Sequence, residues 1–180
     1  MRSPLRTAIL AGAAVAVTGA VTAVTLNASA AEQTRPIPRP HASTAPSPID
    51  PPAGLSKIGT YRVTKGTQTY TCANGSFAGA SVPEAMLAGT RGRLHHFKGP
   101  SWQSERDGSL VTAAKVAESP RTGTIPELLL EIKTHSGTGI LSNADYIQRL
   151  YTSGGVAPTR ACTDGETATV PYGALYVFWG

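Results

Sequence analysis

From residue 60 onward, the chain carries short runs in which polar and apolar residues alternate. Residues 60–63 and 68–72 both alternate, and Lys65-Gly66 between them is typical of a two-residue turn. A repeat of two is expected for strands, because successive side chains point to opposite faces of a sheet. The pattern therefore predicts a hairpin in which Tyr70 and Cys72 share a face and Cys72 points inward.

Further turns and strands are expected along the rest of the chain. Residues 106–109, Arg-Asp-Gly-Ser, predict a second hairpin turn that leads into a strand over residues 110–116. Asp164-Gly165 indicates a third turn, and the chain closes with a strongly strand-forming run over residues 174–179.

Two longer segments, 126–133 and 144–151, fit a helix as well as a strand. Pro126 occupies a helix-start position, and the second segment follows Asn143, a residue type that often caps helices. We assign both segments to strands, because the β-structure around them needs partners for its edges. Many short strands with Gly and Pro turns then predict an all-β single domain, an antiparallel β-sandwich or a barrel.

The N-terminal pattern predicts a secretory signal peptide over residues 1–31. Arg2 and Arg6 precede an uncharged apolar run over residues 7–26, and residues 28–31 offer the small side chains of a cleavage site. A run of about 20 residues is close to the length that spans a bilayer, so a retained anchor is the alternative. Ala, Thr and Gly make the run only weakly apolar, and we therefore expect a secreted, extracellular protein.

Residues 32–52 contain many prolines among Ser, Thr and Ala. Proline locks φ and has no backbone donor, so we expect a Pro-rich disordered linker rather than a helix or strand. The linker either holds the domain away from a surface or is a tail with no role of its own. The folded β-rich domain is expected over residues 53–180, which is long enough for a hydrophobic core.

The cysteines and the net charge indicate a disulfide and give no sign of nucleic-acid binding. Cys72 and Cys162 are the two cysteines, and in an oxidising compartment we expect them to form one disulfide. Free thiols that act as nucleophile or metal ligand are the alternative. The formal net charge of +5 falls to 5 − 2 = +3 when Arg2 and Arg6 are removed with the signal peptide. The basic residues are scattered, a pattern that does not indicate nucleic-acid binding.

Candidate chemistry starts from His95-His96. If residues 93–97 form a strand, the two rings point to opposite faces and cannot easily share one metal ion. A metal-assisted hydrolase would then use His96 together with Asp107 and His135, which are our candidate catalytic residues. Asp107 has the simpler alternative role of stabilising its Asp-Gly turn. No Gly-x-Ser-x-Gly and no Gly-x-Gly-x-x-Gly motif is present, and we expect no metal and no cofactor.

Aromatic residues are the candidates for ligand binding. Trp102 follows Gly99-Pro100, which is typical of a loop, and we add Tyr151 and Tyr172 as further candidates. Exposed aromatic rings outside cells often stack on sugars or anchor protein contacts. Packing in the core is the alternative for each ring.

A series of short motifs relates the chain to a known family. In order, these motifs are Tyr70-Thr71-Cys72, His96 followed by Gly99-Pro100-Ser101-Trp102, Asp107-Gly108-Ser109, Ile147-Gln148-Arg149, Gly154-Gly155-Val156-Ala157-Pro158, Cys162, and Val170-Pro171-Tyr172-Gly173-Ala174. From about Gly54 to Trp179, the chain resembles a family of secreted bacterial and fungal proteins catalogued as a domain of unknown function. The resemblance implies secretion, one domain and a β-rich fold, and it implies no activity.

Three functions stay open at this point. The first is a non-catalytic module that binds an envelope component, with cell-wall or extracellular polysaccharide as its partner. The second is a small secreted metal-assisted hydrolase, and the third is a structural or stress-related surface protein without a ligand. We expect no nucleic-acid partner and, after removal of the signal peptide, no membrane partner.

Overall fold

The computed structural model describes residues 47–180. The predicted signal peptide and most of the predicted linker lie outside the described residues. Within the described part, no helix is long and apolar enough to cross a membrane.

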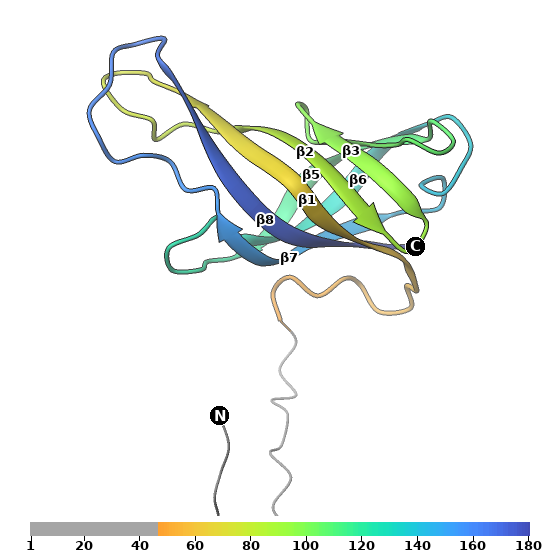
Figure 1. Cartoon of the computed structure of the whole chain (residues 1–180). Coiled ribbons are helices and arrows are strands. Elements are labelled where there is room, and N and C mark those ends of the chain that lie inside the picture. Colours follow the sequence, from red (N-terminus) through yellow and green to blue (C-terminus); the bar gives the residue numbers. More distant parts are fainter. Residues whose placement is uncertain (1–46) are drawn as a thin grey trace, which may run out of the picture. The chain divides into compact units, whose positions relative to one another are not determined.

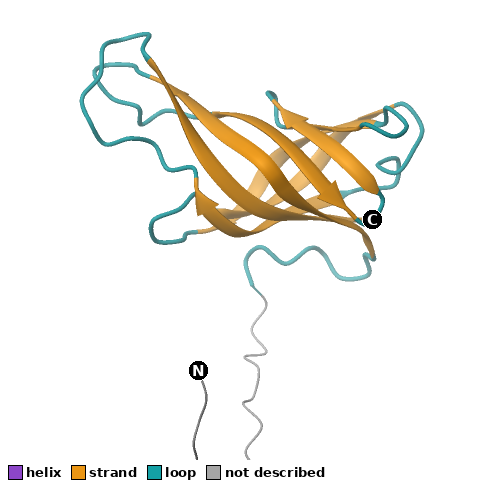
Figure 2. Ribbon diagram, viewed as in Figure 1, coloured by secondary structure: helices purple, strands orange, loops and turns teal. Residues whose placement is uncertain are grey.

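Residues 47–180 fold into eight antiparallel strands that close into a barrel (Figures 1 and 2). The strands are β1 (Lys57–Thr71), β2 (Val82–Gly89), β3 (Gly92–Phe97), β4 (Ser101–Ser104), β5 (Leu110–Ser119), β6 (Glu127–Ser136), β7 (Tyr146–Gly154) and β8 (Thr167–Trp179). Each strand pairs with the next along the chain, and β1 pairs with β8 to close the cylinder. The prediction of an all-β antiparallel fold is confirmed, and of its two forms the barrel is the one that occurs.

The two ambiguous segments are strands. Residues 127–133 fall in β6 and residues 146–151 fall in β7, so the assignment of both segments to strands is confirmed. Three successive residues of β6, Leu128 to Leu130, are buried. Alternation predicts one buried face only, so an unbroken buried run means that both faces of β6 are covered at this point.

The predicted turn at Lys65-Gly66 is wrong. Residues 57–71 form one continuous strand, and its irregularity is a bulge between Val63 and Lys65 where it pairs with β2. Gly66 faces the crowded interior, because a Cβ atom there would lie 2.7 Å from Cγ1 of Val63 and 2.9 Å from Cε1 of Tyr172. The glycine therefore permits close packing inside a strand instead of reversing the chain.

The strand order gives the barrel two different ends. At one end lie the β1–β2, β3–β4, β5–β6 and β7–β8 loops, and we call this the disulfide end. The other end is closed by the β6–β7 loop, where Leu141 and Ala144 are fully buried. The interior near the closed end is filled by Tyr61, Leu94 and Phe178, with an edge-on contact between the rings of Tyr61 and Phe178. Fully burying a side chain of this kind contributes roughly 1.5–3 kcal/mol to folding.

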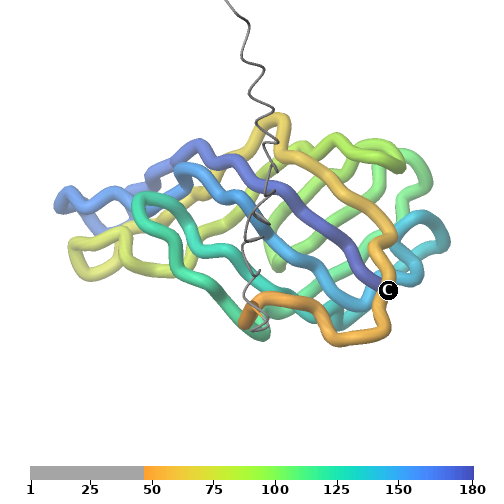
Figure 3. Tube along the Cα trace, turned by 90° about the horizontal axis from the view of Figure 1, so that it is seen from below, coloured from red at the N-terminus to blue at the C-terminus, as the bar shows by residue number. Residues whose placement is uncertain are grey.

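The segment that precedes β1 covers part of the outer face of the barrel (Figure 3). Ile49 is 4% exposed, and its carbonyl oxygen accepts a hydrogen bond of 2.6 Å from Nε2 of Gln148 on β7. Oε1 of Gln148 in turn accepts a hydrogen bond from the indole of Trp179. Residues 47–52, which the sequence assigned to the linker, therefore lie against the barrel.

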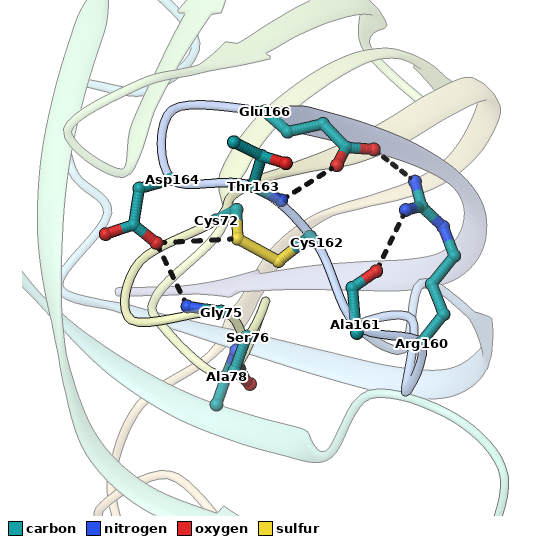
Figure 4. Close-up of a disulfide and its surroundings, with 10 residues drawn as sticks. All are labelled: Cys72, Gly75, Ser76, Ala78, Arg160, Ala161, Cys162, Thr163, Asp164 and Glu166. Atoms are coloured by element: carbon teal, nitrogen blue, oxygen red, sulfur yellow. Dashed lines mark hydrogen bonds and ion pairs between the residues drawn. A yellow bond between two sulfur atoms is a disulfide. The ribbon is translucent and has the colours of Figure 1, made fainter.

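The predicted disulfide between Cys72 and Cys162 is confirmed (Figure 4). It joins the β1–β2 loop to the β7–β8 loop at the disulfide end. Oδ1 of Asp164 accepts a hydrogen bond of 3.0 Å from the backbone N–H of Gly75, and Arg160 pairs with Glu166 at 2.6 Å. The contact between Asp164 and Gly75 joins the two loops beside the bond, whereas the Arg160–Glu166 pair lies within the β7–β8 loop.

Candidate functional site

Two adjoining cavities lie inside and above the barrel at its disulfide end. The inner chamber has a volume of about 120 Å³, and the outer cavity has a volume of about 620 Å³. They share the lining residues Gln68, Ser81, Leu128 and Arg149. The outer cavity is also bordered by residues 78–81 of the β1–β2 loop, which the disulfide ties to the opposite loop. The barrel thus has a mouth at one end that leads into its interior.

The alternation of side chains along each strand places polar groups in the inner chamber. Gln68 comes from β1, His96 from β3, Trp102 from β4, Arg149 from β7 and Tyr176 from β8. Each of these residues occupies an inward position of its strand. The corresponding inward positions near the closed end of the barrel are filled mainly by apolar side chains. The lining of the chamber therefore combines aromatic faces with hydrogen-bonding groups, a mixture that is typical of small-molecule sites.

His96 forms the back of the chamber together with Trp102. The two rings stack with centroids 4.1 Å apart and planes 5° apart, and His96 is 3% exposed. Burial lowers the pKa of His96 to about 3, and the charge of Arg149 acts in the same direction. The imidazole is therefore neutral at neutral pH. Its Nδ1–H donates to the carbonyl oxygen of Ser101 at 2.8 Å, which leaves the lone pair of Nε2 as an acceptor.

His95, the neighbour of His96, lies on the outer face of the barrel. Its Nε2 is 2.5 Å from Oε1 of Glu84 on β2, and its ring stacks at an angle on Phe97. The prediction that the two histidines point to opposite faces is confirmed.

Arg149 is the charged residue that lines both cavities. Its Nε and Nη2 both donate to the carbonyl oxygen of Pro126, at 3.1 and 2.9 Å, which uses two of the five N–H groups of the guanidinium. Within residues 47–180, no carboxylate forms an ion pair with it. At the rim of the outer cavity, Lys115 and Glu118 pair with each other at 2.6 Å. Among the charged side chains that line the two cavities, Arg149 is therefore the one without an ion-pair partner in residues 47–180.

Tyrosines 172 and 176 form a polar pair inside the barrel, with their hydroxyl oxygens 3.3 Å apart. Burial raises the pKa of both hydroxyl groups, whereas the charge of Arg149 lowers both values. Both tyrosines are therefore neutral hydrogen-bonding groups at neutral pH. Trp102 adds a further donor, because its indole N–H is buried and has no acceptor among the described residues.

The three candidate catalytic residues are not brought together. His96 is inside the barrel at the disulfide end, and Asp107 lies in the β4–β5 turn at the closed end. His135 is on the exposed part of β6, with Nε2 2.7 Å from the carbonyl oxygen of Ala144. In the part of the chain that the structure describes, no three His, Cys, Asp or Glu side chains are placed to hold a metal ion.

Asp107 acts as the turn residue that the alternative interpretation expected. Its Oδ1 accepts a hydrogen bond of 2.6 Å from the hydroxyl of Ser109, and its Oδ2 accepts one of 3.1 Å from the backbone N–H of Ile140. These hydrogen bonds, led by that of the Ser109 hydroxyl, lower the pKa of Asp107 to about 2. The carboxylate thereby connects the β4–β5 turn to the loop that closes the barrel.

The three aromatic ligand-binding candidates occupy three different environments. Trp102 is 1% exposed and lines the inner chamber, whereas Tyr172 is buried and its hydroxyl is near that of Tyr176. Tyr151 is 67% exposed and has a φ of 50°, a left-handed conformation that is rare outside glycine. Of the three, Trp102 is the one that reaches the cavities, and it does so from within the barrel rather than from the surface.

Arg149 and Gln68 were not proposed as site residues from the sequence, although Arg149 belongs to the motif Ile147-Gln148-Arg149. A signal for Arg149 was present, because it lies two residues after the buried Ile147 and so shares its inward face. A charged residue on an inward face is an exception to the apolar pattern, and such exceptions are frequent at functional sites. Gln68 lies in the part of β1 that the predicted hairpin treated as a separate strand.

Comparison with known proteins adds a family and no function. A family model described as "Protein of unknown function (DUF3455)" matches residues 88–180. This range runs from the end of β2 to the end of β8, so β1 and most of β2 precede it although they belong to the barrel. No curated protein matches the chain. No solved structure matches it either.

Proposed function

We propose that this chain, which belongs to the DUF3455 family of proteins of unknown function, is a secreted, non-catalytic binding module of the cell envelope. Export is supported by the predicted signal peptide and by the Cys72–Cys162 disulfide, since such bonds persist mainly in oxidising compartments. In this proposal the barrel is a rigid holder, and the ligand enters through its disulfide end.

The observation that carries the proposal is the polar mouth of the barrel. A volume of about 620 Å³ lies within the roughly 300–1,000 Å³ that is typical of ligand pockets. The cavities lack a reactive arrangement among their lining residues: the carboxylate of Glu118 is paired with Lys115, and the imidazole of His96, with its pKa lowered to about 3, is a poor proton acceptor. This lining supports binding rather than hydrolysis.

The proposed ligand is the end or a short segment of an envelope polysaccharide. Sugars present hydroxyl groups and weakly apolar ring faces. The cavities offer hydrogen-bonding side chains, such as Gln68 and Arg149, beside the apolar Leu128 and Ile125. An exported domain meets such polymers at high concentration, so even modest affinity would hold it at the envelope.

The test compares one blocked mouth with a matched control. Ala80 is an exposed residue that lines the outer cavity, whereas Ala88 is an exposed residue near the other end of β2. The exported chain, Ala80→Tyr and Ala88→Tyr would be titrated calorimetrically with solubilised cell-wall polysaccharide and with oligosaccharides prepared from it.

We expect the exported chain and Ala88→Tyr to bind alike and Ala80→Tyr to bind at least about tenfold more weakly, which corresponds to about 1.4 kcal/mol. Equal binding by all three proteins would show that the mouth is not the site. Absence of binding to every envelope fraction would reject the proposal and favour a structural role.

A further inference from the structure

We infer, on the basis of the proposed binding function, that the mouth of the barrel recognises an acidic sugar, with Arg149 binding the single carboxylate of a uronate residue. Four features of the cavities support this inference: the position of the guanidinium, the charge balance, the size of the inner chamber and the polarity of the outer cavity.

The contact with Pro126 orients the guanidinium and leaves one of its edges available. An arginine can grip a carboxylate along the edge formed by Nε and Nη2 or along the edge formed by Nη1 and Nη2. The carbonyl oxygen of Pro126 occupies the first edge, because it accepts hydrogen bonds from both Nε and Nη2. The second edge has one N–H on each terminal nitrogen and lies near the hydroxyl of Tyr176, to which the guanidinium donates in competition with a ligand. A carboxylate can accept both of these N–H groups in parallel.

The charge balance favours an anion with one charge. Arg149 faces both cavities without a carboxylate partner among residues 47–180, and Lys115 and Glu118 neutralise each other at the rim. The charge of Arg149 acts on the interior groups His96, Tyr172 and Tyr176. One cation compensates one carboxylate, whereas a phosphate dianion would leave a net negative charge in a partly buried site, which is costly.

The size of the inner chamber suits the charged group and not the whole sugar. Its volume of about 120 Å³ corresponds to roughly four water molecules at about 30 Å³ each. A carboxylate and its neighbouring atoms occupy a space of this order, so the sugar ring would lie in the outer cavity. Trp102 also lines the chamber, and its buried indole N–H has no acceptor in the described residues.

The outer cavity distinguishes a sugar acid from a fatty acid. Its lining includes Gln68, Ser81 and the Lys115–Glu118 pair, all of which offer hydrogen-bonding groups. Hydroxyl groups of a pyranose ring can use these partners, whereas a hydrocarbon tail would remove them from water without replacing their hydrogen bonds.

The experiment measures calorimetric binding of oligogalacturonate, its methyl ester, glucose 1-phosphate and a short fatty acid to the exported chain. We expect the uronate to bind about 10- to 100-fold more tightly than its neutral ester, the range for a charge-assisted hydrogen-bonded contact. Arg149→Gln should reduce uronate affinity by a similar factor and leave the ester unaffected. Arg62→Gln is the matched control, because Arg62 is an exposed arginine on β1, and it should bind like the parent chain.

The outcomes separate this inference from the proposed function. If the ester and the uronate bind alike, or if Arg149→Gln binds uronate like the parent chain, the acidic-sugar inference fails while binding in the mouth stands. Tighter binding of glucose 1-phosphate or of the fatty acid also overturns the inference. If none of the four probes binds and the Ala80→Tyr comparison shows no effect either, the proposed function itself fails. The ester comparison uses the parent chain, so it decides the matter even if Arg149→Gln does not fold.

Discussion

Removing the disulfide is expected to reduce stability by an amount that follows from the length of chain it closes. Cys72 and Cys162 are separated by 90 residues. The chain-entropy relation for a loop of this length gives about 15–16 cal/mol/K, or about 4.6 kcal/mol at 25 °C. We therefore expect the Cys72→Ala/Cys162→Ala double variant to lose about 4–5 kcal/mol of unfolding free energy.

A loss of this size is a large part of what a small domain has. Natural domains are stable by roughly 5–15 kcal/mol, so the variant should be close to the limit of folding. Cys72 is 2% exposed and packs with Tyr70 and Phe77 in a small cluster at the disulfide end. The disturbance should therefore be greatest at the mouth of the barrel, where residues 78–81 line the outer cavity.

The assay is urea unfolding at 25 °C, followed by circular dichroism and by tryptophan fluorescence. Alanine is used at both positions, because a serine at position 72 would place a hydroxyl group in a buried site. Adding a reductant to the parent chain should reproduce the loss, and adding it to the double variant should change nothing. A loss below about 1 kcal/mol, or a reductant effect that persists in the double variant, would refute the chain-entropy reasoning.

Two further predictions follow from buried positions in the barrel. Burial lowers the pKa of His96 to about 3, against about 6.5 in the unfolded chain, so between these values the unfolded state holds a proton that the folded state lacks. The contribution of His96 to the unfolding free energy should be fully present above pH 6.5 and fall by up to about 4–5 kcal/mol toward pH 3. The unfolding free energy is measured with urea at several pH values for the parent chain and for His96→Phe. If it changes equally with pH in both proteins between pH 6.5 and pH 4, this prediction is wrong. Gly66→Ala should cost about 1–3 kcal/mol, because its Cβ would meet Val63 and Tyr172, whereas Gly79→Ala has open space and should stay within about 0.5 kcal/mol. Equal melting temperatures for the two glycine variants would indicate that position 66 is not a packed interior site.

Local patterns in the sequence predicted a good part of the fold. The turn motif at residues 106–109 identified its outgoing strand, and strand propensity identified the final strand; these are β5 and β8. The two cysteines predicted the disulfide, because in an oxidising compartment two lone thiols have each other as partner. Opposite faces for His95 and His96 followed from the period of two alone.

The errors and omissions come from contacts between residues that are far apart in the chain. Lys65-Gly66 reads locally as a turn, and it is a strand because β1 pairs with β2 on one side and with β8 on the other. The sandwich and the barrel have the same alternation along each strand, and the pairing of β1 with β8 decides between them. Asp107 was placed correctly in its turn, whereas its bond to Ile140 could not be read from the sequence.

The candidate site shows the same division. The sequence alone determined the residue types, the period that turns every second side chain inward, and the pair of cysteines that form the disulfide. Only the tertiary structure brings Gln68, Trp102 and Arg149 from three strands to one cavity, and separates His96 from Asp107 and His135. The physical reason is that periodicity determines which face of a strand is buried, whereas the neighbours across a closed barrel depend on which strands pair and in what register.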